Sequence, residues 1–286
     1  MLVIIGFATV IFCVFGGFLM EGGHLAVLIQ PIEMLIIFGA AGGGLVTSSS
    51  APLLKLIVAQ VLGALKDKGV SKQEYMDLIL CLYEVIKTAK ANPMSLEAHV
   101  EKPDQSAIFS KYPSVVHNHH AIHFLCDTLK VQISSPMNPY DLEDLMNGDI
   151  KTMHDEELKA PASMAKTADA MPGLGIVAAV LGIVITMGKL SQGKEVIGHS
   201  VGAALVGTFL GVLLAYGFMS PLAVKMEAIV VEHGKLLDII KVAVLAYAKD
   251  CSPKVCVEFA RRTIPLDVRP DFDEVDKATS SLKAAA

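Results

Sequence analysis

Ionisable side chains inside apolar stretches are the residues of this chain with the greatest capacity for chemistry. Glu33 is the one carboxylate within an apolar run, and Asp169 stands just before another. A carboxylate at membrane depth is costly and is usually functional, for example as a proton-binding group. Glu33 can also be solvated near the membrane surface, and this second interpretation is favoured. Asp169 fits both a helix N-cap and a group at the mouth of a proton path.

Two later apolar stretches, Pro172–Met187 and Val201–Met219, contain no Asp, Glu, Lys, Arg or His. Their polar side chains are Thr186, Thr208 and Tyr216. The remaining unusual feature is glycine, at Gly173, Gly175, Gly182, Gly202, Gly207, Gly211 and Gly217. Small residues let membrane helices approach closely. Such a pair of helices suits a helix interface or a pore wall, but it cannot by itself relay a proton through a carboxylate.

A proline stands at one end of each of these stretches. Pro172 opens the first, and Pro221 follows the second. Proline is tolerated in the first turn of a helix and otherwise marks helix ends. Both prolines are expected at the same membrane face, so a paired hinge is the alternative to simple termination.

The composition indicates an all-α integral membrane protein. Apolar residues make up 53% and charged residues only 19%, and about 20 apolar residues suffice to cross a bilayer. We expect four transmembrane helices in two hairpins, with a helical cytoplasmic domain inserted between the second and third. The expected helices are 1–20, 29–47, 170–188 and 200–220, the loops are 21–28 and 189–199, the inserted domain is 48–169, and the tail is 221–286.

The positions of the basic residues predict the orientation. Of the 24 lysines and arginines, only Lys189 and Lys194 fall in the two short loops. Positive charge accumulates on the cytoplasmic side, so the inserted domain, the tail and both termini are expected in the cytoplasm. The tail is expected to be helical through Lys249 and irregular after Pro265. A net charge of −5 without a basic run argues against nucleic acid as a partner.

Other reactive side chains have structural interpretations. The four histidines at 117, 119, 120 and 123 could share a helix face and bind a transition metal, but a solvated, partly protonated surface is favoured. The five cysteines are expected to be reduced. No nucleophile–base or phosphate-binding motif is visible, so an enzyme is not expected, nor is a cofactor.

Several segments together resemble the MotA family of stator subunits, over nearly the whole chain. They are Val14–Met20 with Gln30–Glu33, Tyr75–Leu78, Pro172–Val180, Val206–Phe218 with Ser220–Ala223, and Val257–Arg262. The resemblance implies a homopentamer in the lipid bilayer of the bacterial inner membrane, around a dimer of MotB. In that family, an Asp on MotB's single transmembrane helix binds the proton, and the cytoplasmic domain acts on the rotor protein FliG.

The resemblance also implies roles for individual residues. Pro172 and Pro221 correspond to the family's functional prolines. Thr208 and Tyr216 would line the channel, together with the positions of Ala179 and Thr186.

The same resemblance implies a charged rotor contact. The family uses a basic residue and, several positions later, a glutamate. Glu97 matches the acidic member, and Lys90 is the preferred basic member, with Lys87 as the alternative. Without the resemblance, these would be interpreted as solvated helix charges.

The resemblance further implies a coupling ion. Sodium-driven relatives carry Thr seven residues after the third-span proline, where this sequence has Ala179. Sodium needs several oxygen ligands, whereas a proton needs only a carboxylate. Thr186 lies about 10 Å further along a helix and cannot replace the missing ligand, so protons are expected. The competing functions are an ExbB/TolQ-like energiser of outer-membrane processes and a passive membrane scaffold.

Overall fold

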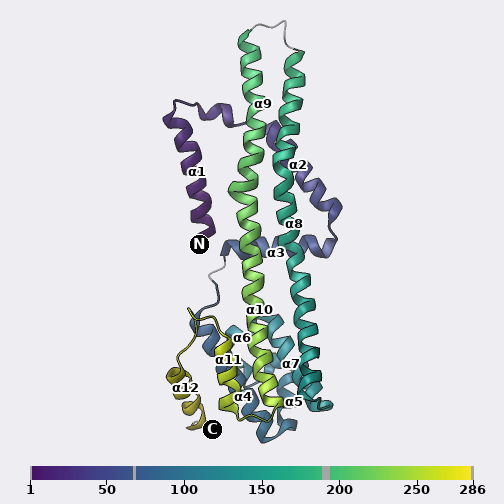
Figure 1. Ribbon diagram of the computed structural model, residues 1–286, viewed down its shortest axis with the longest axis vertical. Coiled ribbons are helices and arrows are strands. Elements are labelled where there is room, and N and C mark those ends of the chain that lie inside the picture. Colours follow the sequence, from purple (N-terminus) through teal and green to yellow (C-terminus); the bar gives the residue numbers. More distant parts are fainter. Residues whose placement is uncertain (1, 67–68, 189–193, 285–286) are drawn as a thin grey trace. The chain divides into compact units, whose positions relative to one another are not determined.

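The computed structural model describes residues 2–66, 69–188 and 194–284, and all regular structure within them is helical (Figure 1). The expected all-α class is therefore confirmed. The chain divides into a unit formed by Met1–Asp67 with Glu156–Val230 and a unit formed by Lys68–Asp155 with Val231–Ala286. We call them the apolar unit and the helical insert unit. Lys189 and the neighbouring residues 190–193 of the loop expected at 189–199 lie outside the described residues.

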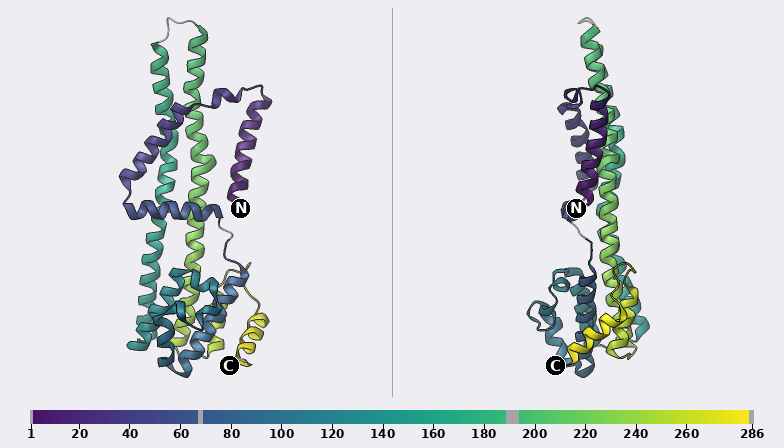
Figure 2. Two further views of the ribbon diagram at one scale, coloured as in Figure 1. Left: turned by 180° about the vertical axis from the view of Figure 1, so that it is seen from behind. Right: turned by 90° about the vertical axis from the view of Figure 1, so that its left-hand side faces the viewer.

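Long apolar helices build the apolar unit. Its elements are α1 (Leu2–Met20), η1 (Leu25–Leu28), α2 (Pro31–Ser48), α3 (Ala51–Lys66), the later part of α8 (Pro139–Met187), α9 (Lys194–Leu214), η5 (Ala215–Met219) and the start of α10 (Ser220–Ala248). Within this unit α8 and α9 run side by side, and α3 runs across the long helices (Figures 1 and 2). Among the described residues, four helical stretches are long and apolar enough to cross a membrane: Leu2–Met20, Leu25–Ser48, Pro139–Met187 and Ser200–Ala248.

The surface of this unit is apolar. Within α1 no residue is buried, and Phe12 is 79% exposed. On α8, Val180 and Val184 are also exposed. Large contiguous apolar surfaces are rare on soluble proteins, whereas a helix whose backbone hydrogen bonds are all internal can expose such side chains to lipid. The four predicted spans are thus present as four long apolar helices.

Two helix boundaries differ from the expectation. The third span was expected to begin near residue 170, but α8 already begins at Pro139. The fourth was expected to end near residue 220, but α9, η5 and α10 follow one another without a break from Lys194 to Ala248. Hydropathy shows where the apolar part of a helix ends. It does not show where the helix itself ends, because polar residues that favour helix can continue it.

The helical insert unit has an ordinary packed core. Its elements are α4 (Lys72–Ala91), α5 (Pro93–Glu101), η2 (Pro103–Gln105), η3 (Phe109–Lys111), α6 (Pro113–His117), α7 (His119–Ser134), the start of α8, the end of α10, α11 (Pro253–Thr263) and α12 (Phe272–Ala284). The interior joins α4, α7 and α10 through Tyr75, Leu82, Leu125 and Ile240, all of which are almost fully buried.

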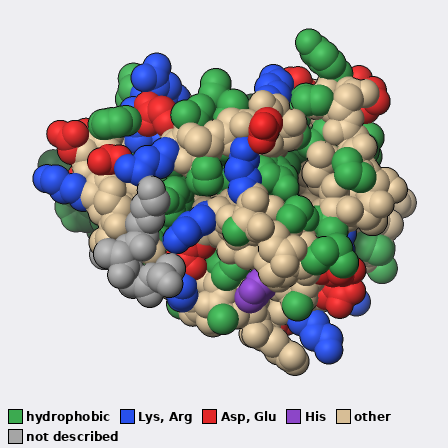
Figure 3. Space-filling view, turned by 90° about the horizontal axis from the view of Figure 1, so that it is seen from below, with side chains coloured by type: hydrophobic (Ala, Val, Ile, Leu, Met, Phe, Trp, Pro, Cys, Tyr) green, Lys and Arg blue, Asp and Glu red, His purple; other side chains and the backbone are tan. Residues whose placement is uncertain are grey.

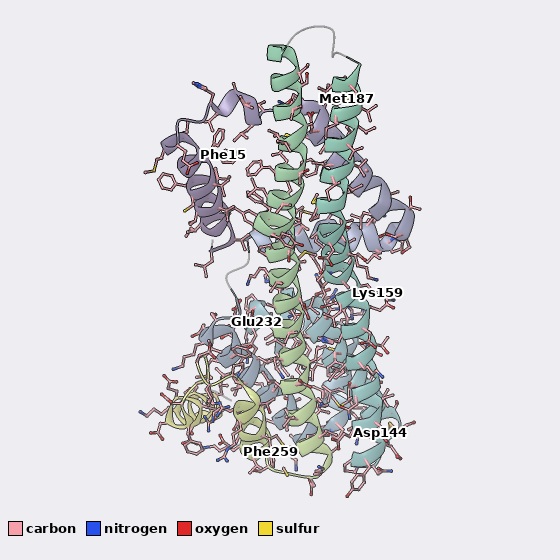
Figure 4. The ribbon with its side chains drawn as sticks, turned by 45° about the horizontal axis from the view of Figure 1, so that its top comes forward. Phe15, Asp144, Lys159, Met187, Glu232 and Phe259 are labelled. Carbon is pink, nitrogen blue, oxygen red and sulfur yellow. The ribbon has the colours of Figure 1, made fainter. Side chains whose placement is uncertain are left out.

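Local capping residues fix the starts of these helices. Ser71 and Glu74 form a capping box at α4, in which the Ser71 hydroxyl accepts from the Glu74 N–H and the Glu74 carboxylate accepts from the Ser71 N–H. Asn92 caps α5 immediately before Pro93. The Glu232 carboxylate on α10, labelled in Figure 4, accepts from the Val70 N–H at 2.7 Å. The start of α4 is therefore tied to α10.

The prediction of an irregular chain after Pro265 is wrong, because α12 occupies Phe272–Ala284. Arg261 and Arg269 donate to backbone carbonyls of the connecting segment, at Pro270 and Ile264. The Lys72–Glu274 ion pair joins α4 to α12, and buried Val275 belongs to the common core. These contacts link residues far apart in the sequence, so no local pattern predicts them.

Candidate functional site

A seam of small residues joins α8 to α9 in the apolar unit. A Cβ added at Gly175 would lie 2.7 Å from the Gly207 carbonyl oxygen and 3.0 Å from the Gly211 Cα. One added at Gly182 would lie 2.9 Å from the Ala204 Cβ. Because side chains are almost absent there, the two backbones are in direct contact. The seam therefore brings α8 and α9 into close contact without an ionisable group between them.

Hydroxyl-bearing side chains stand on α9 and on the following element η5. Thr208, Val212 and Tyr216 follow one another at intervals of four residues and so lie on one helix face. Thr208 is half-buried and Val212 is exposed, while Tyr216 is 62% exposed. We call this stretch the Thr208–Tyr216 face.

The other two predicted channel residues lie in the seam. Ala179 is buried, and a Cβ added at Gly207 would lie 3.3 Å from the Ala179 nitrogen. Thr186 is fully buried and donates its hydroxyl hydrogen to the Gly182 carbonyl at 2.8 Å. The structure therefore groups Thr208 with Tyr216 and separates this pair from Ala179 and Thr186.

A π-helical turn, η5, follows α9 directly. The Ser220 N–H donates to the Ala215 carbonyl, one residue further than in an α-helix. Pro221 stands immediately after this turn, and its ring clashes with the carbonyl four residues earlier in a regular α-helix. The wider turn is a common way for a helix to absorb such a defect.

The π turn is also where α1 contacts the hairpin. The rings of Phe7 and Phe218 have centroids 5.1 Å apart at an interplanar angle of 59°. A Cβ added at Gly217 would lie 3.1 Å from a methyl carbon of Val10. Glycine at this position therefore allows the close approach of α1 to the turn.

The interpretation of the two prolines as helix-terminus markers is wrong. Pro172 lies inside α8, and Pro221 lies within the continuous helix formed by α9, η5 and α10. The N-cap interpretation of Asp169 is wrong for the same reason, because α8 continues through it. Proline by itself favours the end of a helix. Packing against neighbouring helices can nevertheless let the helix continue past the proline. Asp169 is exposed on α8.

Glu33 lies in the first turn of α2 and is partly exposed. A carboxylate in this position interacts favourably with the positive end of the helix dipole. The role of Glu33 stays a prediction.

The predicted rotor-contact residues lie in the helical insert unit. Lys90, in the last turn of α4, contacts the Asp250 carboxylate at 2.6 Å and donates to the Asp250 carbonyl at 2.9 Å. Glu97 is exposed on α5, and Lys87 is partly exposed on α4. Within the described residues, neither Glu97 nor Lys87 forms an ion pair. Figure 3 shows a face of the molecule on which basic and acidic side chains are interspersed.

Carboxyl groups of this unit that accept hydrogen bonds from basic side chains have lowered pKa values, as Asp250 and Glu258 illustrate. The hydrogen bond from Lys90, together with its charge, lowers the pKa of Asp250. The hydrogen bond from Arg261, supported by Arg262, lowers the pKa of Glu258 to about 2. Burial raises the pKa of the Cys126 thiol to about 12, which keeps this thiol protonated and unreactive.

Sequence reasoning missed Asp250 and the π turn. The Lys90–Asp250 pair joins positions 160 residues apart, and nothing near Asp250 in the sequence indicates a lysine partner. The only local signal for the π turn is Pro221. The seam was more visible, because Gly207 and Gly211 are spaced by four residues on one helix face.

Comparisons with known proteins agree over the whole chain. The family described as "Motility protein A N-terminal" matches residues 4–93, and the "MotA/TolQ/ExbB proton channel family" matches residues 117–237. The chain is 36% identical to Motility protein A of Escherichia coli over 99% of this chain and 96% of the relative. It is 35% identical to Chemotaxis protein LafT of Vibrio parahaemolyticus, over 96% of each.

Solved structures share the fold. The structure of C. jejuni MotAB matches with a TM-score of 0.76 and 18% identity, covering 93% of this chain and 96% of that one. The flagellar MotAB stator complex of Bacillus subtilis matches with a TM-score of 0.74 and 21% identity, covering 94% and 98%.

The fold and the seam define a multi-pass helical membrane protein in which the apolar stretches Pro172–Met187 and Val201–Met219 carry no Asp, Glu, Lys, Arg or His. It is a channel-type protein and not an enzyme. The chain belongs to the MotA family of flagellar motor stator proteins, within the MotA/TolQ/ExbB proton channel family. The match to the MotA N-terminal family over residues 4–93 decides against the ExbB/TolQ-like energiser and the passive scaffold.

Proposed function

We propose that this chain forms the ring of a flagellar stator and couples proton flow across the bacterial inner membrane to torque on the rotor. The observation that carries the proposal is the close-packed seam between α8 and α9, which contains no charged side chain and is bordered by the Thr208–Tyr216 face. A wall of this kind can guide an ion past a partner's ionisable group. It cannot hold the proton itself, so the mechanism requires a second protein.

The partner in this proposal is a MotB dimer whose transmembrane Asp binds the proton. The related solved structures are MotAB complexes, and the hairpin has a hydroxyl-bearing face suited to lie beside such a carboxylate. Tyr216 and Thr208 can donate hydrogen bonds to the ionised Asp and leave it when it is protonated. Ala179 and Thr186, in the seam, would then act by setting the hairpin geometry and not by contacting the ion.

Five copies of the chain would surround this dimer. The apolar faces of α1 and α8 supply surfaces for neighbouring copies and for lipid, because they carry exposed large side chains such as Phe12 and Val184. In this arrangement the helical insert unit and both termini lie in the cytoplasm. The distribution of basic residues supports that orientation.

Pro172 and Pro221 act as the mechanical elements of the proposed cycle. Each removes one backbone hydrogen bond from a long helix, and the π turn before Pro221 brings the defect next to Tyr216. A change in the charge of the partner's Asp can therefore shift the turn between π and α geometry. This shift would be transmitted along α10.

The rotor protein FliG would meet the chain at Glu97 and Lys90, with Lys87 as the alternative basic group. Protons are the proposed coupling ion, because this chain has Ala179 at the position where a sodium-driven relative would have a threonine hydroxyl as a sodium ligand. Asp169, exposed on α8, is a candidate for proton exit, and Glu33 is the weaker candidate for the opposite mouth.

Proton uptake in cells tests this function directly. In this experiment the chain is expressed together with a MotB partner that lacks any channel-closing segment. The cytoplasm of these cells should acidify faster than that of cells expressing either protein alone. Replacing the partner's transmembrane Asp with Asn should abolish the difference. Equal acidification by this chain alone would contradict the requirement for a partner carboxylate.

A further inference from the structure

The C-terminus of α10 ends in a turn that normally requires glycine. The Cys251 N–H donates to the Ala246 carbonyl at 3.0 Å, and the Asp250 N–H donates to the Tyr247 carbonyl at 2.9 Å. These two bonds define a Schellman motif, whose left-handed residue is usually Gly. Asp250 fills it with φ +61°, and it is the only non-glycine residue with positive φ in the described chain. A side chain at this strained position calls for an explanation in function.

The Asp250 side chain contacts only one described group. Its carboxylate is 97% exposed and lies 2.6 Å from the Lys90 Nζ, while the Lys90 side chain is 25% exposed. Lys90 also donates to the Asp250 backbone carbonyl at 2.9 Å. One residue thus occupies two of the three N–H donors of this ammonium group and neutralises its charge.

The fold does not need this ion pair to join α4 to α10. Ala89 on α4 and Ala243 and Ala246 on α10 are buried in the common core, and burial of apolar surface is the stronger term. Exposed ion pairs contribute little to stability. Asp250 therefore combines a strained backbone with a contact of small structural value, and the donor in that contact, Lys90, is the residue predicted to bind the rotor.

We propose that Asp250 is a specificity-determining residue of the rotor contact, an internal carboxylate that occupies Lys90 until an acidic group on the rotor replaces it. This inference rests on the proposed function, because it assumes that Lys90 meets the rotor. A rotor carboxylate that approaches Lys90 meets the Asp250 charge at the same time. The neighbouring Lys87 lacks such a competitor among the described residues, so Asp250 sets how strongly Lys90 contributes relative to Lys87.

The expected effect is modest and measurable. Exchange of one exposed ion pair for another changes the free energy by little, so removing the competitor should strengthen the contact by about two- to fivefold. The sign of the change in contact strength distinguishes the two possible roles of Asp250. Loss of an acidic residue from a contact that used it directly would weaken the contact instead.

Two substitutions remove the carboxylate without straining the turn. Asp250→Gly suits the left-handed backbone best, and Asp250→Asn tolerates it while keeping the size of the side chain. Asp127→Asn is the matched control, because it also releases a lysine from an exposed ion pair, with Lys130 at 2.9 Å on α7. Fluorescently labelled stators are exchanged at running motors, and the dwell time is measured by recovery after photobleaching.

Both Asp250 variants should dwell longer by about two- to fivefold, and Asp127→Asn should leave the dwell time unchanged. The increase should disappear when Asp250→Asn is combined with Lys90→Gln. An unchanged or shorter dwell in the Asp250 variants, with Lys90→Gln alone shortening it, would overturn the role of Asp250 and leave the rotor contact intact. A Lys90→Gln variant with normal dwell would overturn the rotor contact through Lys90 itself.

Discussion

Helices pack through different side chains in the two units of this protein. The α8–α9 seam uses Gly175, Gly207 and Gly211, where backbones touch and no polar group is available. The helical insert unit instead buries large side chains such as Tyr75 and Leu82 and arranges ion pairs on its surface. In lipid the hydrophobic effect does not hold helices together, so close contact replaces it. The seam of the apolar unit should therefore tolerate no added volume, whereas the helical insert unit should respond to charge and pH.

The largest expected effect is that of a valine in the seam. Gly175→Val adds atoms where even a Cβ would lie 2.7 Å from the Gly207 carbonyl oxygen. Overpacking typically costs about 1–3 kcal/mol, and a backbone atom cannot rotate away, so the assembled complex should be lost. Gly173→Val is the control, because a Cβ there meets nothing within 4 Å. Native gels and thermal inactivation of the purified complex measure the difference, and equal losses in both variants would contradict the seam.

The second effect separates motion from stability. Pro172→Ala and Pro221→Ala each restore an N–H inside a helix, where proline is less favourable than alanine by about 3 kcal/mol. Both variants should be at least as stable as the parent protein and should not swim. Pro161, the other proline inside α8, provides the control, since Pro161→Ala should be stable and motile. Reduced protein levels in the Pro172 and Pro221 variants would instead show that these prolines are needed for the stability of the protein.

The third effect is confined to the helical insert unit and depends on pH. The pKa of Glu258 is lowered to about 2 by Arg261 and Arg262. Its ordinary value in an unfolded chain is about 4.3. The stabilisation is therefore fully present above about pH 4.3 and is lost as the pH falls toward 2. Glu258→Gln should lower the denaturation midpoint at pH 7 and have almost no effect near pH 2, as measured by circular dichroism. The same midpoint shift at both pH values would mean that the carboxylate charge is irrelevant.

The smallest single effects should come from the rotor-contact charges. An exposed ion pair contributes about 0–1 kcal/mol, so Lys90→Gln or Glu97→Gln alone should reduce swimming speed only in part. Reversing both charges should stop swimming, and compensating reversals on FliG should restore it. Normal swimming after the double reversal would exclude these residues from the contact.

Much of the fold could be predicted from the sequence, because membrane depth imposes a length and a composition. Leu2–Met20 was expected as a helix and is one. Helix ends were harder, since Pro172 favours termination locally and the helix nevertheless continues through it. The reason is packing against other helices, which the local preference of a single residue does not include.

The site was predictable where it depends on one helix and not where it depends on two distant segments. Thr208 and Tyr216 were chosen from the family resemblance, and the structure places Thr208 on α9 and Tyr216 in the adjoining π turn, while their channel role stays a prediction. The environment of Lys90 depends on Asp250, which is distant in the sequence and held by an unusual backbone turn. The burial of Thr186 depends likewise on α9 lying against α8.

The most direct test of proton coupling is the rotation of single motors driven by this chain and its partner. In tethered cells held at constant proton-motive force, rotation speed should be the same with and without external sodium. It should collapse when a protonophore is added. A speed that follows external sodium at constant proton-motive force would contradict proton coupling, because it would require oxygen ligands beyond Thr208 around the partner's carboxylate.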